Sequence, residues 1–108
     1  MTIDNLTYLL MELRSKIDEI DFELIQLLKE RMRLSIEVGE VKRSYDAPVY
    51  CPRREAEILE RVGNGEYGES LQEVYREIFR VSRQVQDWWS ILFDVKILDK
   101  NSISQESS

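Results

Sequence analysis

The chain has 108 residues, of which 43% are hydrophobic and 33% charged, a composition that suits one globular domain rather than two. Its net charge of −6 disfavours a nucleic-acid partner, and the absence of histidine removes the commonest general base and metal ligand, so no metal site is expected. One cysteine, an N-terminus unlike a signal peptide and no apolar run near about 20 residues predict a cytoplasmic protein without a membrane span.

A long first helix is predicted from about Leu6 to about Ser44. No proline interrupts this stretch, and its apolar residues recur at alternating steps of three and four, as in a helix that packs against other helices. They are Leu6, Leu9, Leu13, Ile17, Ile20, Leu24, Leu27, Leu34, Val38 and Val41. A helix of about 38 residues is longer than a small domain is wide, so we expect part of it to be covered by another subunit. Arg31 stands at one apolar position of the series, where it either reaches out to solvent or lines a polar pocket.

A loop around Pro48 is expected to lead into a second, short helix over about Pro52–Val62, with Ile58, Leu59 and Val62 as its buried face. Gly63-Asn64-Gly65 predicts its end.

A third helix is predicted from a capping box at Ser70–Glu73 to about Ile97. Its apolar series is Leu71, Val74, Ile78, Val81, Val85, Trp88, Leu92 and Val95. One of Trp88 and Trp89 is expected in the core. Residues 1–98 would form one all-α domain of long, short and long helices, and residues 99–108 a disordered polar tail.

Several stretches of sequence, in order and at matching spacing, resemble the all-helical class of chorismate mutase. The resemblance covers about Leu6 to Gln86. The stretches are Leu13–Asp18 with Ile20–Asp21, Leu28–Met32, Val38–Lys42, Pro48–Tyr50 with Arg54–Glu55, and Ser82–Gln86. It implies an intertwined homodimeric helical bundle that rearranges chorismate, a small dianion, to prephenate on the route to phenylalanine and tyrosine. No covalent intermediate, metal or cofactor is implied. The work would consist of holding the reactive conformer and stabilising charge as the ether bond breaks.

The resemblance implies that Arg14 and Arg31 bind the substrate's carboxylates, for which a planar guanidinium is suited. The two residues lie 17 positions apart on one predicted helix, or about 26 Å by helical rise. If both serve one site, Arg14 must therefore come from the second subunit. The alternative for each is a solvated surface arginine.

By the same resemblance, Lys42 and Gln86 contact the ether oxygen, and Lys42 also a carboxylate. Ser82 lies four residues before Gln86 on the same helix face and would contact a carboxylate. Val38 matches a position whose backbone lines the pocket, although a core valine explains it equally well. Lys42 could instead be a lysine that interacts with the helix dipole at the C-terminal end.

Arg54 matches a carboxylate-binding arginine, and Glu55 a residue that accepts a hydrogen bond from the substrate hydroxyl, although either could be an ordinary surface charge. The chain departs from the family at Cys51, where Asp is common. Because cysteine caps a helix poorly, we expect a cost of about 1 kcal/mol and one lost hydroxyl contact.

Two other functions are considered. A lyase of the same fold, which eliminates pyruvate from isochorismate, shares the arginines and the lysine but generally lacks a glutamate like Glu55. A non-catalytic helical interaction module would not need Arg31 within an apolar series or the polar pair Ser82 and Gln86.

Overall fold

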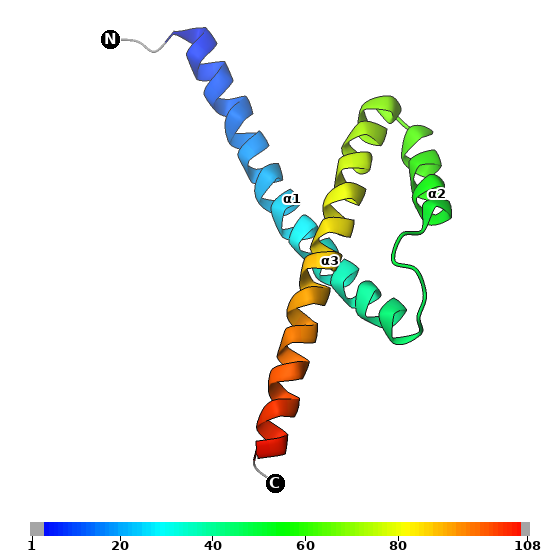
Figure 1. Cartoon of the computed structure of the whole chain (residues 1–108). Coiled ribbons are helices and arrows are strands. Elements are labelled where there is room, and N and C mark those ends of the chain that lie inside the picture. The colour runs from blue at the N-terminus through cyan, green and yellow to red at the C-terminus, as the bar shows by residue number, and fades with distance from the viewer. Residues whose placement is uncertain (1–3, 107–108) are drawn as a thin grey trace. The chain divides into compact units, whose positions relative to one another are not determined.

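A computed structural model describes the backbone of residues 4–106 and the side chains of residues 4–87. Its elements are three helices, α1 (Asn5–Ser44), α2 (Pro52–Gly63) and α3 (Gly68–Glu106), with no strand among the described residues (Figure 1). This confirms the predicted all-helical class and the order of long, short and long helices. The chain divides into two units, Met1–Arg33 and Leu34–Ser108.

The first unit is the N-terminal part of α1. Asp4 begins it, because its side-chain Oδ1 accepts a hydrogen bond from the Leu6 amide at 3.1 Å and its carbonyl accepts from the Tyr8 amide at 3.0 Å. The predicted apolar series is exposed here, with between 48% and 66% of each residue accessible for Leu6, Leu9, Leu13, Ile17, Ile20, Leu24 and Leu27. A single helix has no second element within its own unit on which to bury these side chains.

The C-terminal end of α1 belongs to the second unit and closes in a Schellman motif. Asp46 adopts the left-handed conformation with φ 54°, and its amide donates to the Arg43 carbonyl at 3.2 Å. The Ala47 amide donates to the Lys42 carbonyl at 2.8 Å. These two bonds satisfy carbonyls that the last helical turn leaves without intrahelical partners, and aspartate tolerates this conformation better than most residues. Pro48 then keeps the chain from continuing as a helix.

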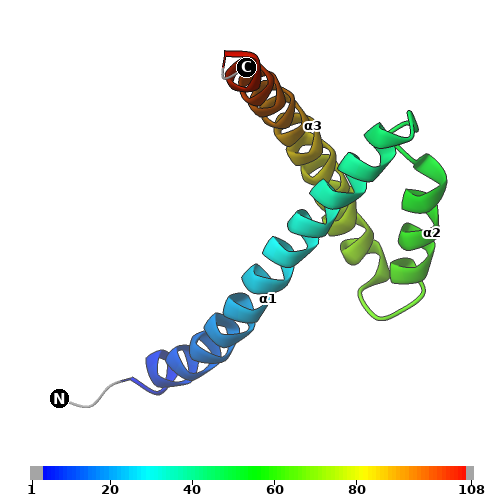
Figure 2. The ribbon, with the colours of Figure 1, turned by 90° about the horizontal axis from the view of Figure 1, so that it is seen from below.

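Helix α2 packs on α3, and both views of the ribbon show it beside the N-terminal part of that helix (Figure 2). The Gln72 side-chain amide donates to the Leu59 carbonyl at 2.9 Å. Gly68 starts α3 against the end of α2 so closely that an added Cβ would lie 2.2 Å from the Gly63 carbonyl oxygen. The predicted inner residues of α2 (Ile58, Leu59 and Val62) are half-buried in the single chain.

The predicted start of α3 is wrong by a few residues. The helix begins at Gly68, directly after Tyr67, whose φ is 59° and whose carbonyl accepts from the Leu71 amide at 2.8 Å. Ser70 therefore lies inside the first turn and does not cap it. A tyrosine in the left-handed conformation is uncommon, so this helix start could not be predicted from the sequence.

The predicted end of α3 near Ile97 is also wrong, because the helix continues to Glu106. No proline or glycine stands between these residues to stop it. Ser107 and Ser108 lie outside the described residues, and the domain boundary at residue 98 stays a prediction.

The residues of α3 that the chain buries form a line next to the predicted apolar series. Phe79 is 5% and Ser82 8% exposed, and the Tyr75 ring meets the Phe79 ring edge-on with 5.8 Å between centroids. By contrast, Leu71 and Val74 of the predicted series are exposed. On α3, Phe79 and Ser82 are thus buried within the chain, while Ile78, Val81 and Val85 of the predicted series are half-buried like Tyr75. The predicted places of Trp88, Trp89, Leu92 and Val95 lie outside the described side chains.

In the part of the chain that the structure describes, no helix combines the length and the apolar character needed to cross a bilayer.

Candidate active site

Gln86 joins α3 to α1 within the second unit. Its side-chain amide donates to the Ser35 carbonyl over 2.8 Å. Gly39 is buried beside it, and a Cβ added at this glycine would lie 3.4 Å from Gln86 Cγ. The Gln86 side chain therefore lies directly against α1, where a methyl group at residue 39 would just be in van der Waals contact with it. An amide fixed in this way is a hydrogen-bond donor with a defined position.

Lys42 lies at the end of α1, where its backbone is part of the Schellman motif. Its side chain is half-buried, and Nζ donates to the Val49 carbonyl at 3.0 Å. This bond ties the ammonium group to the loop before α2. Since an ammonium has three donors, the contact with Val49 leaves capacity for an anionic ligand.

Glu55 faces α3 from the first turn of α2 and forms an ion pair with Arg83, whose Nη1 donates to Glu55 Oε2. The guanidinium carbon of Arg83 also lies 4.9 Å from the centre of the Tyr50 ring. Arg83 of α3 therefore holds Glu55 directly, and Tyr50 of the loop contacts Arg83. The sequence analysis missed both partners.

Two further predicted residues of the second unit have different surroundings. Ser82 is buried on α3, four residues from Gln86, so the two predicted donors share one helix face as expected. Val38 is 46% exposed in the single chain.

The remaining predicted residue of this unit, Arg54, is exposed on α2. Its Nη1 lies 3.8 Å from Glu57 Oε2, and Arg53 Nε lies 3.6 Å from Glu57 Oε1. Such exposed pairs within one helix contribute little to stability and leave the guanidinium accessible to another carboxylate.

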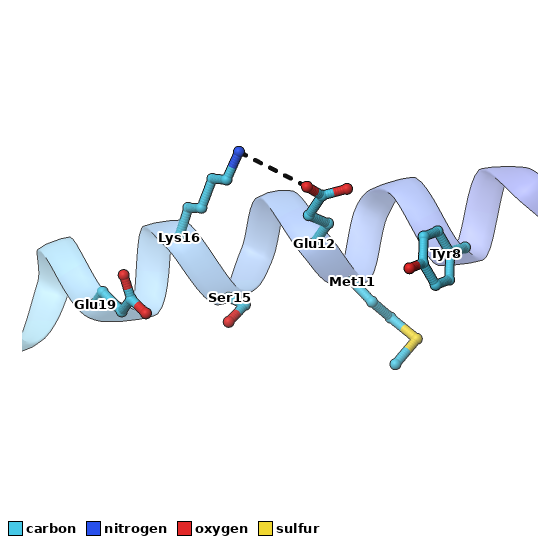
Figure 3. Close-up of a pocket in the computed structure, with 6 residues that line it drawn as sticks. All are labelled: Tyr8, Met11, Glu12, Ser15, Lys16 and Glu19. Carbon is cyan, nitrogen blue, oxygen red and sulfur yellow. Dashed lines mark ion pairs between the residues drawn. The ribbon is translucent and has the colours of Figure 1, made fainter.

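The two predicted carboxylate-binding arginines of α1, Arg14 and Arg31, belong to the first unit. Arg14 is exposed and Arg31 is half-buried. This unit also carries a shallow hollow along one face of α1, which Figure 3 shows. No predicted site residue lines it; the lining residues are Tyr8, Met11, Glu12, Ser15, Lys16 and Glu19.

The two carboxyl groups with lowered pKa values, Glu30 and Glu77, lie on the surface and are not among these predicted site residues. Hydrogen bonds from Arg33 lower the pKa of Glu30, and those from Arg80 lower the pKa of Glu77. Both pairs lie within single helices and are exposed, so neither marks a buried acid or base. Among the described side chains, no group of three or more cysteines, aspartates and glutamates is placed to hold a metal ion.

The second unit therefore offers a cation from Lys42, a neutral donor from Gln86, a buried hydroxyl from Ser82 and an acceptor from Glu55. Each comes with a defined contact or burial. Such a set can bind a small polar anion and stabilise negative charge on an oxygen.

Comparison with known proteins identifies a family. The model of chorismate mutase type II matches residues 13–87. A bifunctional chorismate mutase/prephenate dehydratase of Aquifex aeolicus is 43% identical over 77 residues, which cover 64% of this chain and 21% of that protein. A chorismate mutase of Methanocaldococcus jannaschii is 42% identical over 53 residues, or 49% of this chain and 54% of that one.

A solved structure agrees with these sequence matches. The chorismate mutase of Thermus thermophilus superposes with a TM-score of 0.68 at 30% identity, covering 72% of this chain and 93% of that one. The chain spans only about a fifth of the length of the Aquifex relative. Because the family model matches well over half of the chain and the fold agrees, the chain belongs to the chorismate mutase type II family.

Proposed function

We propose that this chain catalyses the intramolecular rearrangement of chorismate to prephenate. The observation that supports this best is the placement of Lys42, Gln86 and Glu55, each held by a contact from another part of the second unit. The family match extends over all three residues. Together they provide two donors for an ether oxygen and an acceptor for a hydroxyl.

In the proposed mechanism, the enzyme selects the compact conformer of chorismate and stabilises charge as the ether bond breaks. Lys42 and Gln86 donate to the ether oxygen, on which negative charge develops. Arg54 and Ser82 bind a carboxylate, and Glu55 accepts from the ring hydroxyl. The bond that forms and the bond that breaks both lie within the substrate, so no group of the protein needs to act as a nucleophile.

We further propose that the active form is a homodimer in which two first helices cover one another. The exposed apolar series of α1 from Leu6 to Leu27 supports this, because burying such residues is worth about 1.5–3 kcal/mol for each side chain. In proteins most of the stability of a helix also comes from packing of its apolar face. A second copy would supply both the apolar cover and the packing.

The two arginines of α1 support a shared site. Arg14 and Arg31 lie on one unbroken helix, separated by ~26 Å of helical rise. One small dianion cannot reach both from a single chain. We therefore propose that Arg14 and Arg31 of one chain serve different sites of the dimer, as the resemblance implies, with Val38 beside the substrate.

The first experiment is to incubate the purified protein with chorismate and to identify the product. Prephenate formed faster than in the spontaneous reaction, and lost in Arg31→Ala, supports the mutase. Absence of turnover with chorismate, together with release of pyruvate from isochorismate, would instead indicate a lyase. Absence of both activities would favour an interaction module.

A second experiment tests the shared site. Arg14→Ala and Arg31→Ala are purified separately, then mixed under conditions that exchange subunits. After random exchange, half of the dimers contain one chain of each variant. If the arginines of one site come from different subunits, each of these mixed dimers has one intact site. The mixture then regains about a quarter of the parental activity. If both arginines of a site came from one chain, no site would be intact and the mixture would stay inactive.

The dimer itself is tested by sedimentation equilibrium of Ile17→Glu, which places a charge in the apolar series. We expect monomers or unfolded chains. The matched control is Lys16→Gln, which also lowers the net charge by one but changes an exposed residue whose Nζ lies 3.9 Å from Glu12 Oε1. A stable Ile17→Glu dimer would contradict the proposed interface. The cytoplasmic location stays a prediction, which fractionation of the native cell would test.

A further inference from the structure

The ion pair between Arg83 and Glu55 differs from five ion pairs that lie within single helices, Glu12–Lys16, Glu30–Arg33, Arg53–Glu57, Arg54–Glu57 and Glu77–Arg80. Those pairs connect residues three or four positions apart on one helix, and both partners are at least half exposed. Arg83 and Glu55 instead connect α3 with α2, and their side chains are 36% and 23% exposed. Partial burial weakens screening by solvent, so this pair is held more firmly than the surface pairs.

Arg83 is itself held on a second side. Its guanidinium carbon lies 4.9 Å from the centre of the Tyr50 ring, within the range of a cation–π contact. Tyr50 directly precedes Cys51, the residue at the start of α2. The arginine thus connects the entry of α2, its first turn and α3 at one point.

The contact engages one oxygen of the Glu55 carboxylate, Oε2. A carboxylate has a second oxygen with its own lone pairs, which can accept from a ligand while the first is held. Fixing Oε2 restricts the rotation of the carboxylate and so defines where Oε1 points. This restriction matters more here because the residue one turn earlier is Cys51, which offers no carboxylate of its own.

We propose that Arg83 is a positioning residue that holds the Glu55 carboxylate in the orientation that receives the ring hydroxyl of chorismate. The inference rests on the proposed mutase function. Arg83 does not contact the substrate in this assignment; it acts through Glu55, with Tyr50 holding the guanidinium in place. A positioned acceptor contributes to rate because small displacements from the reactive geometry are costly.

The test measures kcat and KM of Arg83→Ala on two substrates, chorismate and an analogue that lacks the ring hydroxyl. On chorismate we expect about a tenfold loss in kcat/KM, the size expected for one misplaced hydrogen bond to a charged group. On the analogue we expect no loss in kcat/KM, because there is no hydroxyl from which Glu55 could accept a hydrogen bond. The ratio of the two values within one variant does not depend on how much of the protein is folded.

Two further variants distinguish positioning from structural support. Arg83→Lys keeps the charge and should recover part of the loss. The double variant with Glu55→Ala should be no worse than Glu55→Ala alone, because Arg83 then has nothing to position. The matched control is Arg80→Ala, which removes an exposed ion pair with Glu77 from the same helix and should behave like the parent on both substrates.

The outcomes separate this inference from the proposed function. An equal loss on both substrates, or additive losses in the double variant, would overturn the positioning role while the mutase stands. Arg83→Ala that matches Arg80→Ala would do the same. A parent protein that does not convert chorismate would overturn the proposed function and this inference with it.

Discussion

The start of α2 gives a quantitative test of how residue 51 affects stability. Cys51 occupies the N-cap position with φ −125° and ψ 89°, and its carbonyl accepts the first intrahelical bond, from the Glu55 amide at 3.2 Å. Its side chain makes no capping hydrogen bond, which confirms the expected poor cap. Pro52 follows, at the position where a missing amide hydrogen costs nothing. The geometry of a capped helix is present, but the acceptor is absent.

Cys51→Asp supplies that acceptor, and three contributions determine its effect. A carboxylate oxygen at the N-cap that accepts from the amide of Arg53 or Arg54 should contribute about 1 kcal/mol. Interaction with the helix dipole adds about 0.5 kcal/mol. Repulsion of Glu55, four residues later, subtracts about 0.3 kcal/mol, less if the ion pair with Arg83 neutralises it. The net expectation is a stabilisation of about 1 kcal/mol.

Thermal unfolding measures this difference, at one fixed protein concentration because the Tm of the proposed dimer would depend on concentration. For a domain of this size, 1 kcal/mol corresponds to about 4–8 °C in Tm. Cys51→Asn is the matched control, because it caps without charge and should be similarly stable but insensitive to salt. Cys51→Ala should be no more stable than the parent. If Cys51→Ala were as stable as Cys51→Asp, the missing cap would not be the cause and the reasoning would fail.

Three other changes have definite expected outcomes. Gln86→Glu should lose turnover as the pH rises through the pKa of the new carboxyl group, because only the protonated form donates a hydrogen bond, whereas the parent should stay active above neutral pH. Profiles of turnover against pH test this. A parent whose turnover fell sharply between about pH 5 and 7 would refute the neutral donor. Gly68→Ala should lower the free energy of unfolding, measured by chemical denaturation, by more than about 1 kcal/mol, because its Cβ would lie 2.2 Å from the Gly63 carbonyl oxygen. The control Gly65→Ala should stay within about 0.5 kcal/mol of the parent, because its Cβ would meet nothing within 4 Å. Lys42→Met should lower kcat on chorismate by about 10²–10³-fold with unchanged circular dichroism, and a smaller loss would remove the ammonium from the mechanism.

The sequence predicted the existence and order of the helices because two physical signals agreed. Apolar residues at steps of three and four marked the long helices, and the cluster around Pro48 and Pro52 marked the break between the first two. The ends were less predictable. Helix α3 starts after Tyr67, whose left-handed conformation is uncommon for tyrosine and so was not predicted. The helix also continues past Ile97, where the polar composition alone suggested an end.

Apolar periodicity marked faces of the helices, but it did not identify the residues that are buried within the chain. On α3 the chain buries Phe79 and Ser82, while Val74 of the predicted series stays exposed. A periodic series cannot distinguish these two faces, because the partner of each face depends on the arrangement of other elements.

The candidate site residues came from the resemblance to a family, and periodicity would not have found them. The contacts that hold these residues were not predictable at all. Glu55 and Arg83 lie 28 positions apart and meet only because α2 packs on α3. The approach of Gln86 to Ser35 spans 51 positions and passes beside the buried Gly39.

The placement of polar groups on the packing surface of α3 argues for chemistry over mere assembly. Burying a hydroxyl or an amide is costly unless it is hydrogen-bonded, and an apolar residue at Ser82 or Gln86 would avoid that requirement. The chain instead buries Ser82 and directs the Gln86 amide onto α1 across a glycine, so that the donor is fixed before any ligand arrives. Glu55 is fixed in the same way from α3. Electrostatic catalysis of a reaction without a nucleophile requires polar groups that are held in place in this way. The stabilisation of developing charge depends on donors that need no rearrangement during the reaction.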